Sequence, residues 1–407
     1  NFWQPLKGWW NDMKIRGSYG SLGNQVMDDL GNFPYLATYG TNSSYNYLIN
    51  GSKPVIVKAP GLVAPDFTWE TVTQMDFGFD ASFLNNRLTG TFDWYRRNTK
   101  DMLVAGATLP ATLGASVPKS NSADMKTIGW ELSLGWNDRL ENGFSYWVKG
   151  VLSDYQATIT KYAGNDAGFY SQSDGDGKYY VGQKIGEIWG YHSNGLFQSD
   201  DEAATIDQSE LYAGKWGAGD VKYEDLDNDG KITKGEETIY NPGDKSIIGN
   251  KTPRYQFGIT VGFDYKNFDF EMFWQGTGKR DYMLSGAQFW GFTSQWDVPY
   301  TPALDYWTET NTDAYFPRPG WQNGGNRVTS DRYLQSAAYG RLKNLTVGYT
   351  IPKNLTTKWG ISRLRLYVTG ENLLTITPLN DAFDPETLGG MTYPINRKVA
   401  IGLNLTL

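Results

Sequence analysis

The sequence contains no cysteine, which excludes disulfide bonds and thiolate metal sites. It also contains one histidine, His192, so neither a Ser-His-Asp catalytic centre nor a histidine-based metal centre is expected, and we interpret His192 as an ordinary loop residue. No apolar run reaches the length of about 18 residues that a transmembrane helix requires. That criterion does not detect membrane-spanning strands, because only half of their residues are apolar.

Positive charge is scarce as well. The 37 lysines and arginines are outnumbered by 44 aspartates and glutamates, which leaves a net charge of −7, and no basic stripe occurs. Nucleic acid is therefore not expected as a partner, because its phosphates are bound by clustered cations. The chain begins at Asn1 rather than at a methionine, so we expect either a removed signal peptide or a piece of a longer protein.

Aromatic residues and glycine are abundant instead, at 15% and 47 residues, which favours strands and loops over helix bundles. The clearest strand covers residues 252–265 and turns at Lys266-Asn267 into a second strand. One of its faces is polar or small, and the other carries Tyr255, Phe257, Ile259, Val261, Phe263 and Tyr265. Strands of globular proteins average about 5–6 residues, whereas membrane strands need about 9–11. From this segment alone, an outer-membrane barrel and a large sandwich or propeller are both candidate folds.

Ten segments alternate in this way: 12–20, 72–83, 87–97, 125–136, 143–156, 252–265, 267–276, 337–350, 361–372 and 397–407. The connections between them are long and short in strict alternation. Outer-membrane barrels have short periplasmic turns and long extracellular loops, so the alternation predicts an all-β, antiparallel transmembrane β-barrel. The loops are too large for a closed barrel of ten strands, and we expect the C-terminal part of a larger barrel.

A metal-binding pattern lies within the long extracellular loop expected at residues 157–250. Residues 225–236 fit the twelve-residue calcium loop, in which acids and one carbonyl converge around a glycine turn. The predicted ligands are Asp225, Asp227, Asp229, Lys231 (through its carbonyl) and Glu236. Calcium suits this all-oxygen set, and magnesium is an alternative that prefers more water. Because no amphipathic helix precedes the pattern, we expect an isolated loop with a structural ion rather than an EF-hand pair; a solvated acidic turn is the competing interpretation.

A second long extracellular loop is expected at residues 277–336, and it is rich in aromatic side chains. Exposed rings beside amides and carboxylates could contact sugar faces or peptides, and such rings also mark protein interfaces. The competing interpretation is that each ring packs the loops together. The candidates for contact with substrate or partner are Trp290, Trp296, Tyr300, Trp307 and Trp321.

Several segments resemble the SusC/RagA group of TonB-dependent outer-membrane transporters from Bacteroidetes. They are residues 14–20 with Gly23-Asn24, the run from Gly219-Asp220 into residues 225–236, Ile247 to Asn250, 253–258, Gly370 to Leu373, and the approach from Tyr393 to Arg397. The resemblance implies a barrel of about 22 strands around an N-terminal plug, of which this chain is the C-terminal ten or so. It also implies a SusD-like surface lipoprotein as partner, energy from a TonB complex that acts through the plug, and a glycan or oligopeptide as cargo.

Uptake through an outer-membrane channel is therefore the leading functional hypothesis. The main alternative is a calcium-stabilised surface protein, an adhesin or sugar-binding β-protein, that does not transport. An enzyme is not expected, because a glycosidase would need two carboxylates about 5–10 Å apart and no feature of the sequence singles out such a pair.

Overall fold

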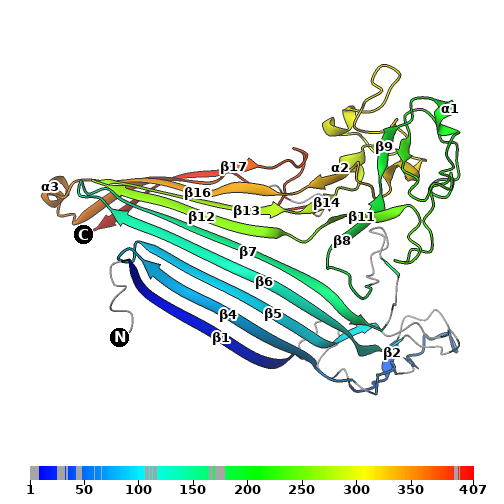
Figure 1. Cartoon of the computed structure of the whole chain (residues 1–407), viewed down its shortest axis with the longest axis horizontal. Helices are drawn as coiled ribbons and strands as arrows, with labels where there is room; N and C mark the ends of the chain where they lie inside the picture. The colour runs from blue at the N-terminus through cyan, green and yellow to red at the C-terminus, as the bar shows by residue number, and fades with distance from the viewer. Residues whose placement is uncertain are drawn as a thin grey trace.

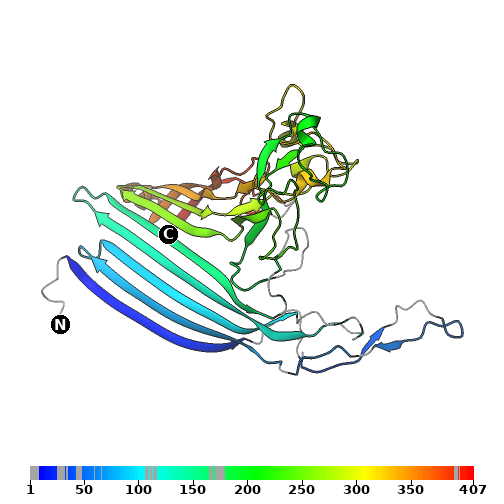
Figure 2. The same ribbon diagram turned by 45° about the vertical axis from the view of Figure 1, so that its right-hand side comes forward.

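The structure is a computed structural model, and it describes residues 9–24, 33, 35–42, 48–58, 60–65, 67–105, 110, 112, 117–163, 165, 168–169, 179–388, 393 and 395–407. Its main element is a curved antiparallel sheet of ten strands, with β1 and β18 at its two edges (Figures 1 and 2). In sheet order the strands are β1 (Trp10–Asn24), β4 (Glu70–Phe83), β5 (Leu88–Ala105), β6 (Lys119–Arg139), β7 (Ser145–Tyr162), β12 (Arg254–Tyr265), β13 (Phe268–Lys279), β16 (Tyr339–Thr350), β17 (Arg363–Ile376) and β18 (Lys398–Thr406).

Each of the ten predicted strands is present, and sequence neighbours pair along the whole order. The predicted bounds were too short in the middle of the sheet, where β5 continues to Ala105 and β6 begins at Lys119. These extensions lack the apolar alternation that a lipid-facing segment shows: the added start of β6 is mostly polar, whereas β5 ends in the uninterrupted apolar run Met102–Ala105. With about 3.4 Å per residue, the 21 residues of β6 are much longer than an apolar band of about 25 Å.

The two ends of the sheet differ in their connections. One end, which we call the short-turn end, carries residues 84–87, 140–144, 266–267 and 351–362. The opposite long-loop end carries residues 25–69, 106–118, 163–253, 280–338 and 377–397. The tight turns are favoured by Asn85 and Asn86, which adopt positive φ angles of 58° and 64°. The predicted alternation of long and short connections is confirmed.

The two faces of the sheet have different chemistry. Strand register aligns apolar side chains into rows across neighbouring strands, for example Ile15, Phe79, Phe92, Leu132, Leu152 and Phe257. The next residues along these strands form a polar row: Arg16, Gly78, Asp93, Glu131, Ser153 and Gln256. We call these the apolar face and the polar face. A barrel wall in a membrane needs this division, with lipid outside and a wet or plugged bore inside.

Ion pairs on the polar face cross more than one strand. Arg16 on β1 contacts both Asp80 on β4 and Asp93 on β5, at 2.9 and 3.0 Å. Arg365 on β17 pairs with Asp269 on β13 across the intervening β16, where Gly348 lies between them. A Cβ atom on Gly348 would lie 2.5 Å from Asp269 Oδ1 and 2.6 Å from Arg365 Nε, so a side chain at this position would displace the ion pair.

At the long-loop end of the sheet, parts of the long connections form a compact group of loops. Residues 179–253, 280–338 and 377–388, which we call the loop body, contain the following short elements: β8 (Glu187–Tyr191), β9 (Ser193–Leu196), α1 (Asp200–Ala203), β10 (Val221–Tyr223), β11 (Lys245–Asn250), β14 (Asp281–Met283), α2 (Ala287–Trp290), η3 (Thr301–Leu304), η4 (Gly324–Arg327) and β15 (Leu334–Ser336). Outside it lie β2 (Gly40–Asn42), β3 (Ile56–Lys58), α3 (Lys353–Thr356) and η5 (Thr357–Trp359). Within the described part of the chain, the helices are too short and too polar to cross a membrane.

The hydrophobic core lies in the loop body rather than in the sheet. Its buried cluster combines side chains from three separate connections: Tyr191, Leu196, Val221, Tyr223, Ile232, Met283, Leu284, Phe289, Trp290, Phe316, Tyr333, Ala337, Leu379 and Leu388. The sheet has no second protein layer against either face among the described residues, so its apolar side chains stay exposed in the isolated chain, as for Ile259 with 39% of its surface accessible.

The assignment of the apolar face to lipid can be tested at the centre of β12. Replacing Ile259 or Val261 with arginine should lower the free energy of unfolding in lipid vesicles by roughly 2–4 kcal/mol, because a charge would enter the bilayer midplane. Thr260→Arg, on the polar face of the same strand, is the matched control and should cost less. Neutral results at both Ile259 and Val261 would mean that this face does not meet lipid.

Candidate functional site

A buried carboxylate joins the two largest connections of the loop body. Asp220, 1% exposed, accepts hydrogen bonds from Nε and Nη2 of Arg318 at 3.0 and 2.7 Å, in a bidentate pair. It also accepts from Asn326 Nδ2 at 2.8 Å and from the Gly217 amide at 2.9 Å. Asp220 precedes β10, whereas Arg318 and Asn326 belong to the 280–338 connection. This network therefore holds the two connections together.

Backbone contacts reinforce the same joint. The Val221 amide donates to Asn326 Oδ1 at 2.8 Å, and the buried Tyr223 hydroxyl donates to the Gly325 carbonyl at 2.6 Å. Burial raises the pKa of Tyr223 well above its ordinary value, so this hydroxyl stays protonated and available as a donor. The two connections consequently form one packed unit rather than two independent loops.

The acidic loop follows directly after β10. Asp225, Asp227 and Asp229 each place one carboxylate oxygen within 4.8 Å of the other two. The turn is shaped by hydrogen bonds from backbone amides to Asp225: Asn228 donates to Oδ1 at 2.7 Å and Gly230 to Oδ2 at 2.7 Å. Gly230, with φ of 84°, occupies the sharp turn that the pattern predicted for it.

The pKa values of two carboxylates in this loop shift in opposite directions. For Asp225, desolvation alone would raise the pKa, but hydrogen bonds from the Gly230, Asn228 and Asp229 amides outweigh it, and the pKa is lowered. For Asp227, desolvation and the charge of Asp229 raise the pKa. Among the described residues, none of the three aspartates forms a salt bridge with a basic side chain. Three converging carboxylates with only amide donors around them suit a hard cation with oxygen ligands.

The last predicted ligand lies outside this cluster. Glu236 is exposed and does not belong to the cluster of three aspartates, and its amide donates to the Asn241 carbonyl. Lys231 stays beside the cluster and donates its amide to Asp229 Oδ1 at 2.8 Å. The expected absence of flanking helices is confirmed over residues 204–250, which contain β10 and β11 but no helix.

A residue that the sequence pattern did not indicate closes the loop. Asp244 is fully buried and accepts the Leu226 amide at 2.8 Å and the Thr233 amide at 2.7 Å, which links the beginning of the acidic loop to its end. Ile232, also fully buried, carries the loop into the hydrophobic cluster, and its amide donates to the Asp207 carbonyl at 2.7 Å. The acidic turn is thus fixed to the core of the loop body.

The aromatic candidates fall into two groups. Trp290 is buried, at 8% exposure, and Trp307 is partly buried against the same cluster. For Trp290 the structure agrees with the interpretation that the ring packs the loops together, because it packs on Tyr333 with ring centroids 4.6 Å apart. Trp296, Tyr300 and Trp321 are exposed, at 83%, 46% and 46%. These three rings are free to contact a ligand or a partner.

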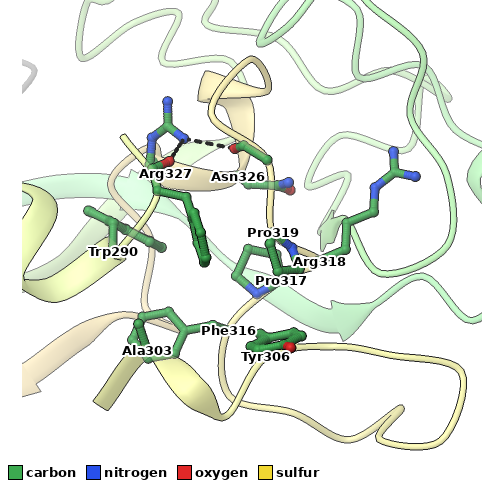
Figure 3. Close-up of a pocket in the computed structure, with 11 residues that line it drawn as sticks. Trp290, Ala303, Tyr306, Phe316, Pro317, Arg318, Pro319, Asn326 and Arg327 are labelled. Carbon is green, nitrogen blue, oxygen red and sulfur yellow. Dashed lines mark hydrogen bonds between the residues drawn. The ribbon is translucent and has the colours of Figure 1, made fainter. Parts of the chain in front are cut away.

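A pocket with a cavity volume of only about 20 Å³ lies beside the buried rings. Figure 3 shows its lining, which consists of Trp290, Phe292, Ala303, Tyr306, Phe316, Pro317, Arg318, Pro319, Gly320, Asn326 and Arg327. Arg327 donates Nη1 to the Phe292 and Gly320 carbonyls, both at 3.2 Å. Burial lowers the pKa of Arg327, which the nearby Asp297 partly offsets. Through its hydrogen bonds, the Arg327 guanidinium fixes the backbone at Phe292 and Gly320.

His192 is not the ordinary loop residue that we expected. Its Nδ1 lies 2.7 Å from Asp331 Oδ2 and its Nε2 lies 2.7 Å from Ser246 Oγ. Asp331 also accepts the Ser193 amide at 3.0 Å. The arrangement connects β11, the β8–β9 junction and the 280–338 connection, so it is a third link between the parts of the loop body.

Comparisons with known proteins agree with the fold. The sequence profile of the family described as TonB dependent receptor-like, beta-barrel matches residues 2–373. TonB-dependent receptor P3 of Formosa agariphila is 29% identical over 96% of this chain and 39% of its own length. TonB-dependent receptor SusC of Bacteroides thetaiotaomicron is 26% identical over 97% of this chain and 37% of its own length.

Solved structures give the same result for the fold. The structure titled "Structure of the RagAB peptide transporter" superposes with a TM-score of 0.75 at 22% identity, over 98% of this chain and 41% of the matched chain. The chain thus spans between 37% and 41% of the length of the relatives that it matches.

The joint at Asp220 can be tested by truncating the carboxylate. Asp220→Ala should destabilise the loop body by about 1–3 kcal/mol, because the buried Gly217 amide and Asn326 side chain would lose their acceptor, whereas the part-exposed Arg318 can be solvated by water. Hydrogen exchange should accelerate in residues 190–250 and 315–335 together, while the strands of the sheet keep their protection. Ser209→Ala, at an exposed position of the same connection, is the control. Unchanged exchange in Asp220→Ala would contradict the proposed joint.

Proposed function

This chain belongs to the family of TonB dependent receptor-like β-barrels, which lie in the bacterial outer membrane, and we propose that it forms one wall of an uptake channel there. The observation that carries the proposal is the division of one ten-stranded sheet into an apolar face and a charged face, with a packed loop body at one end. Such a sheet separates lipid from an aqueous bore, and the loop body lies where cargo would enter.

The chain is about two fifths of a relative's length, so the channel needs further parts. In our proposal the remaining N-terminal strands close a barrel of about 22 strands against the free edges of β1 and β18. A plug fills the bore, meets the polar face, and couples to the TonB complex in the periplasm. The family consists of receptors rather than enzymes, and we therefore treat the Ser246–His192–Asp331 arrangement as a structural link.

The cargo class is a glycan or an oligopeptide. Exposed Trp296, Tyr300 and Trp321 offer flat apolar surfaces next to amides and carboxylates, a combination that suits sugar faces and peptide side chains. Of these relatives, RagAB is described as a peptide transporter, whereas SusC is named as a TonB-dependent receptor without a cargo.

A SusD-like lipoprotein is the partner that we place over the loop body. Trp296, Val298, Tyr300 and Leu304 are all exposed within one short stretch of the 280–338 connection. The turn before them is held by Asp297, whose Oδ2 accepts the Thr293 and Ser294 amides at 2.8 and 2.7 Å. The Thr293 hydroxyl and these amides lower the pKa of Asp297, so the turn keeps its charge and shape above acidic pH. A preorganised group of exposed apolar residues is typical of a protein interface.

We also propose that Asp225, Asp227 and Asp229 hold a structural Ca²⁺, with Mg²⁺ as the weaker alternative. The ion would neutralise carboxylates that have no basic partner in the described chain, and it would fix a turn whose next residue, Ile232, enters the core. Its function would be to stabilise a long connection that is otherwise costly to order. Glu236 would need to move to become a ligand, whereas Asp244 closes the loop without contacting the ion.

The transport proposal can be tested in cells that carry the full-length protein. Deletion should abolish energy-dependent uptake of either labelled glycans or labelled oligopeptides. The double variant Trp296→Ala/Val298→Ser should reduce the recovery of the copurifying lipoprotein by about fivefold or more, since each buried interface anchor contributes over about 1 kcal/mol. Trp359→Ala, an exposed ring at the short-turn end, should leave recovery unchanged. Normal uptake of both cargo classes after deletion would reject the transport function.

The calcium proposal has a separate test. Asp225→Ala/Asp227→Ala should make residues 200–250 sensitive to protease, as should a chelator on the parent protein, while the sheet remains intact. Adding Ca²⁺ should restore resistance in the parent but not in the variant. Glu236→Gln is the informative comparison, because it should retain most of the Ca²⁺ response. Equal protease resistance with and without chelator would rule out a structural ion.

A further inference from the structure

The connection between β16 and β17 is unusual for the short-turn end. The connections at 84–87, 140–144 and 266–267 are tight turns, whereas residues 351–362 form α3 (Lys353–Thr356) and η5 (Thr357–Trp359). Figure 1 shows this segment projecting beyond the ends of the strands. A turn of two residues would join these strands, so the additional helical segment calls for an explanation.

The segment is anchored firmly and still exposes apolar side chains. Thr356 is fully buried, and the Ile351 and Ile361 amides donate to the Leu364 and Thr356 carbonyls at 2.8 and 3.1 Å. Leu355 in α3 and Trp359 at the end of η5 are 45% and 63% exposed. The backbone is thus fixed in a way that leaves about half or more of each of these two side chains exposed.

The segment begins at the level of an aromatic belt. Tyr349, directly before it, packs on Phe268 with ring centroids 4.7 Å apart, and Phe268 is 54% exposed. Phe144 stacks on Phe263 nearby at 5.5 Å, at the same end of the sheet. Tyr349 and Leu364, which flank the segment, both belong to the apolar face. Aromatic belts of outer-membrane barrels lie at the lipid headgroups, and short turns lie on the periplasmic side.

The charge of the segment is the opposite of that of the whole chain. Lys353 and Lys358 are its two charged residues, and residues 351–362 contain no acid, although the chain has a net charge of −7. Both lysines are exposed. Exposed apolar side chains flanked by lysines, next to an aromatic belt, are the features of a segment that lies in the membrane interface.

We propose that residues 353–359 are a lipid anchor on the periplasmic leaflet of the outer membrane. Leu355 and Trp359 enter the boundary between headgroups and acyl chains, and Lys353 and Lys358 bind the phosphates of acidic phospholipids. The occupant of this surface is lipid rather than a periplasmic protein, because the surface continues the lipid-facing side of the sheet and carries the complementary charge. The proposal depends on the outer-membrane location and not on the cargo or the lipoprotein partner.

The absence of cysteine makes a direct test practical, because single cysteines can be spin-labelled in the full-length protein without background from this chain. Leu355→Cys and Trp359→Cys are compared in nanodiscs with Asn354→Cys and Thr357→Cys, which are exposed polar positions of the same segment. Val368→Cys, on the apolar face of β17, and Glu141→Cys, in an exposed turn, provide the lipid and water references.

Labels at positions 355 and 359 should show an oxygen-to-nickel-complex accessibility ratio between the two references and severalfold above Glu141→Cys. Labels at 354 and 357 should match Glu141→Cys. A water-like ratio at both 355 and 359 in purified nanodiscs would overturn the proposal, and it is the result that a surface reserved for a periplasmic protein would give.

Lipid composition tests the role of the lysines. Replacing phosphatidylcholine with phosphatidylglycerol should increase the depth of the label at 355, and this dependence should disappear in the background Lys353→Gln/Lys358→Gln. Because both lysines are exposed, the variant should fold like the parent protein. Heat-modifiable migration on a gel checks this. A phosphatidylglycerol dependence that survives in the variant would overturn the phosphate-binding step.

Discussion

The structure depends on the requirement that one sheet satisfy its own backbone hydrogen bonds while its two faces meet different surroundings. Only closed barrels and helices can do this in hydrocarbon, where no water replaces a missing bond. Because successive side chains of a strand point to opposite faces of the sheet, each side chain faces either lipid or the bore. The row that runs from Ile15 through Phe92 to Phe257 lies one residue away from the row that runs from Arg16 through Asp93 to Gln256. A register shift of one residue would place charges in lipid, so this alternation fixes the pairing of every strand.

The position of the hydrophobic core follows from the same requirement. A wall one sheet thick, with lipid on one side and a bore on the other, provides no interior in which large side chains can be buried against protein. The loop body supplies that interior, and it contains Tyr223, Tyr333 and Phe289, which are almost fully buried. Three polar links hold its parts together: Asp220 with Arg318 and Asn326, His192 with Ser246 and Asp331, and Asp244 within the acidic loop.

This arrangement relates the acidic loop to the proposed transport. Asp225, Asp227 and Asp229 lie on the surface, but the loop that carries them continues into the core through Ile232 and into the joint through β10. An ion at this position would stabilise the loop body, which bears the exposed rings, without contacting cargo itself. The exposed stretch from Trp296 to Leu304 is likewise supported by polar contacts of the turn at Asp297. Rigid support of exposed rings lowers the entropic cost of binding a partner.

Local patterns in the sequence determined the ten strands, the alternation of short and long connections and the three clustered aspartates, because each depends on residues close together in the chain. The long ends of β5 and β6 were missed because apolar and polar residues do not alternate there, and alternation was the signal used to find strands. Only the tertiary structure decided that Trp290 is buried, that Asp244 rather than Glu236 closes the acidic loop, and that His192 meets Ser246 and Asp331. These contacts join residues up to 139 positions apart, and such partners are selected by the packing of whole connections against each other, which no local pattern encodes.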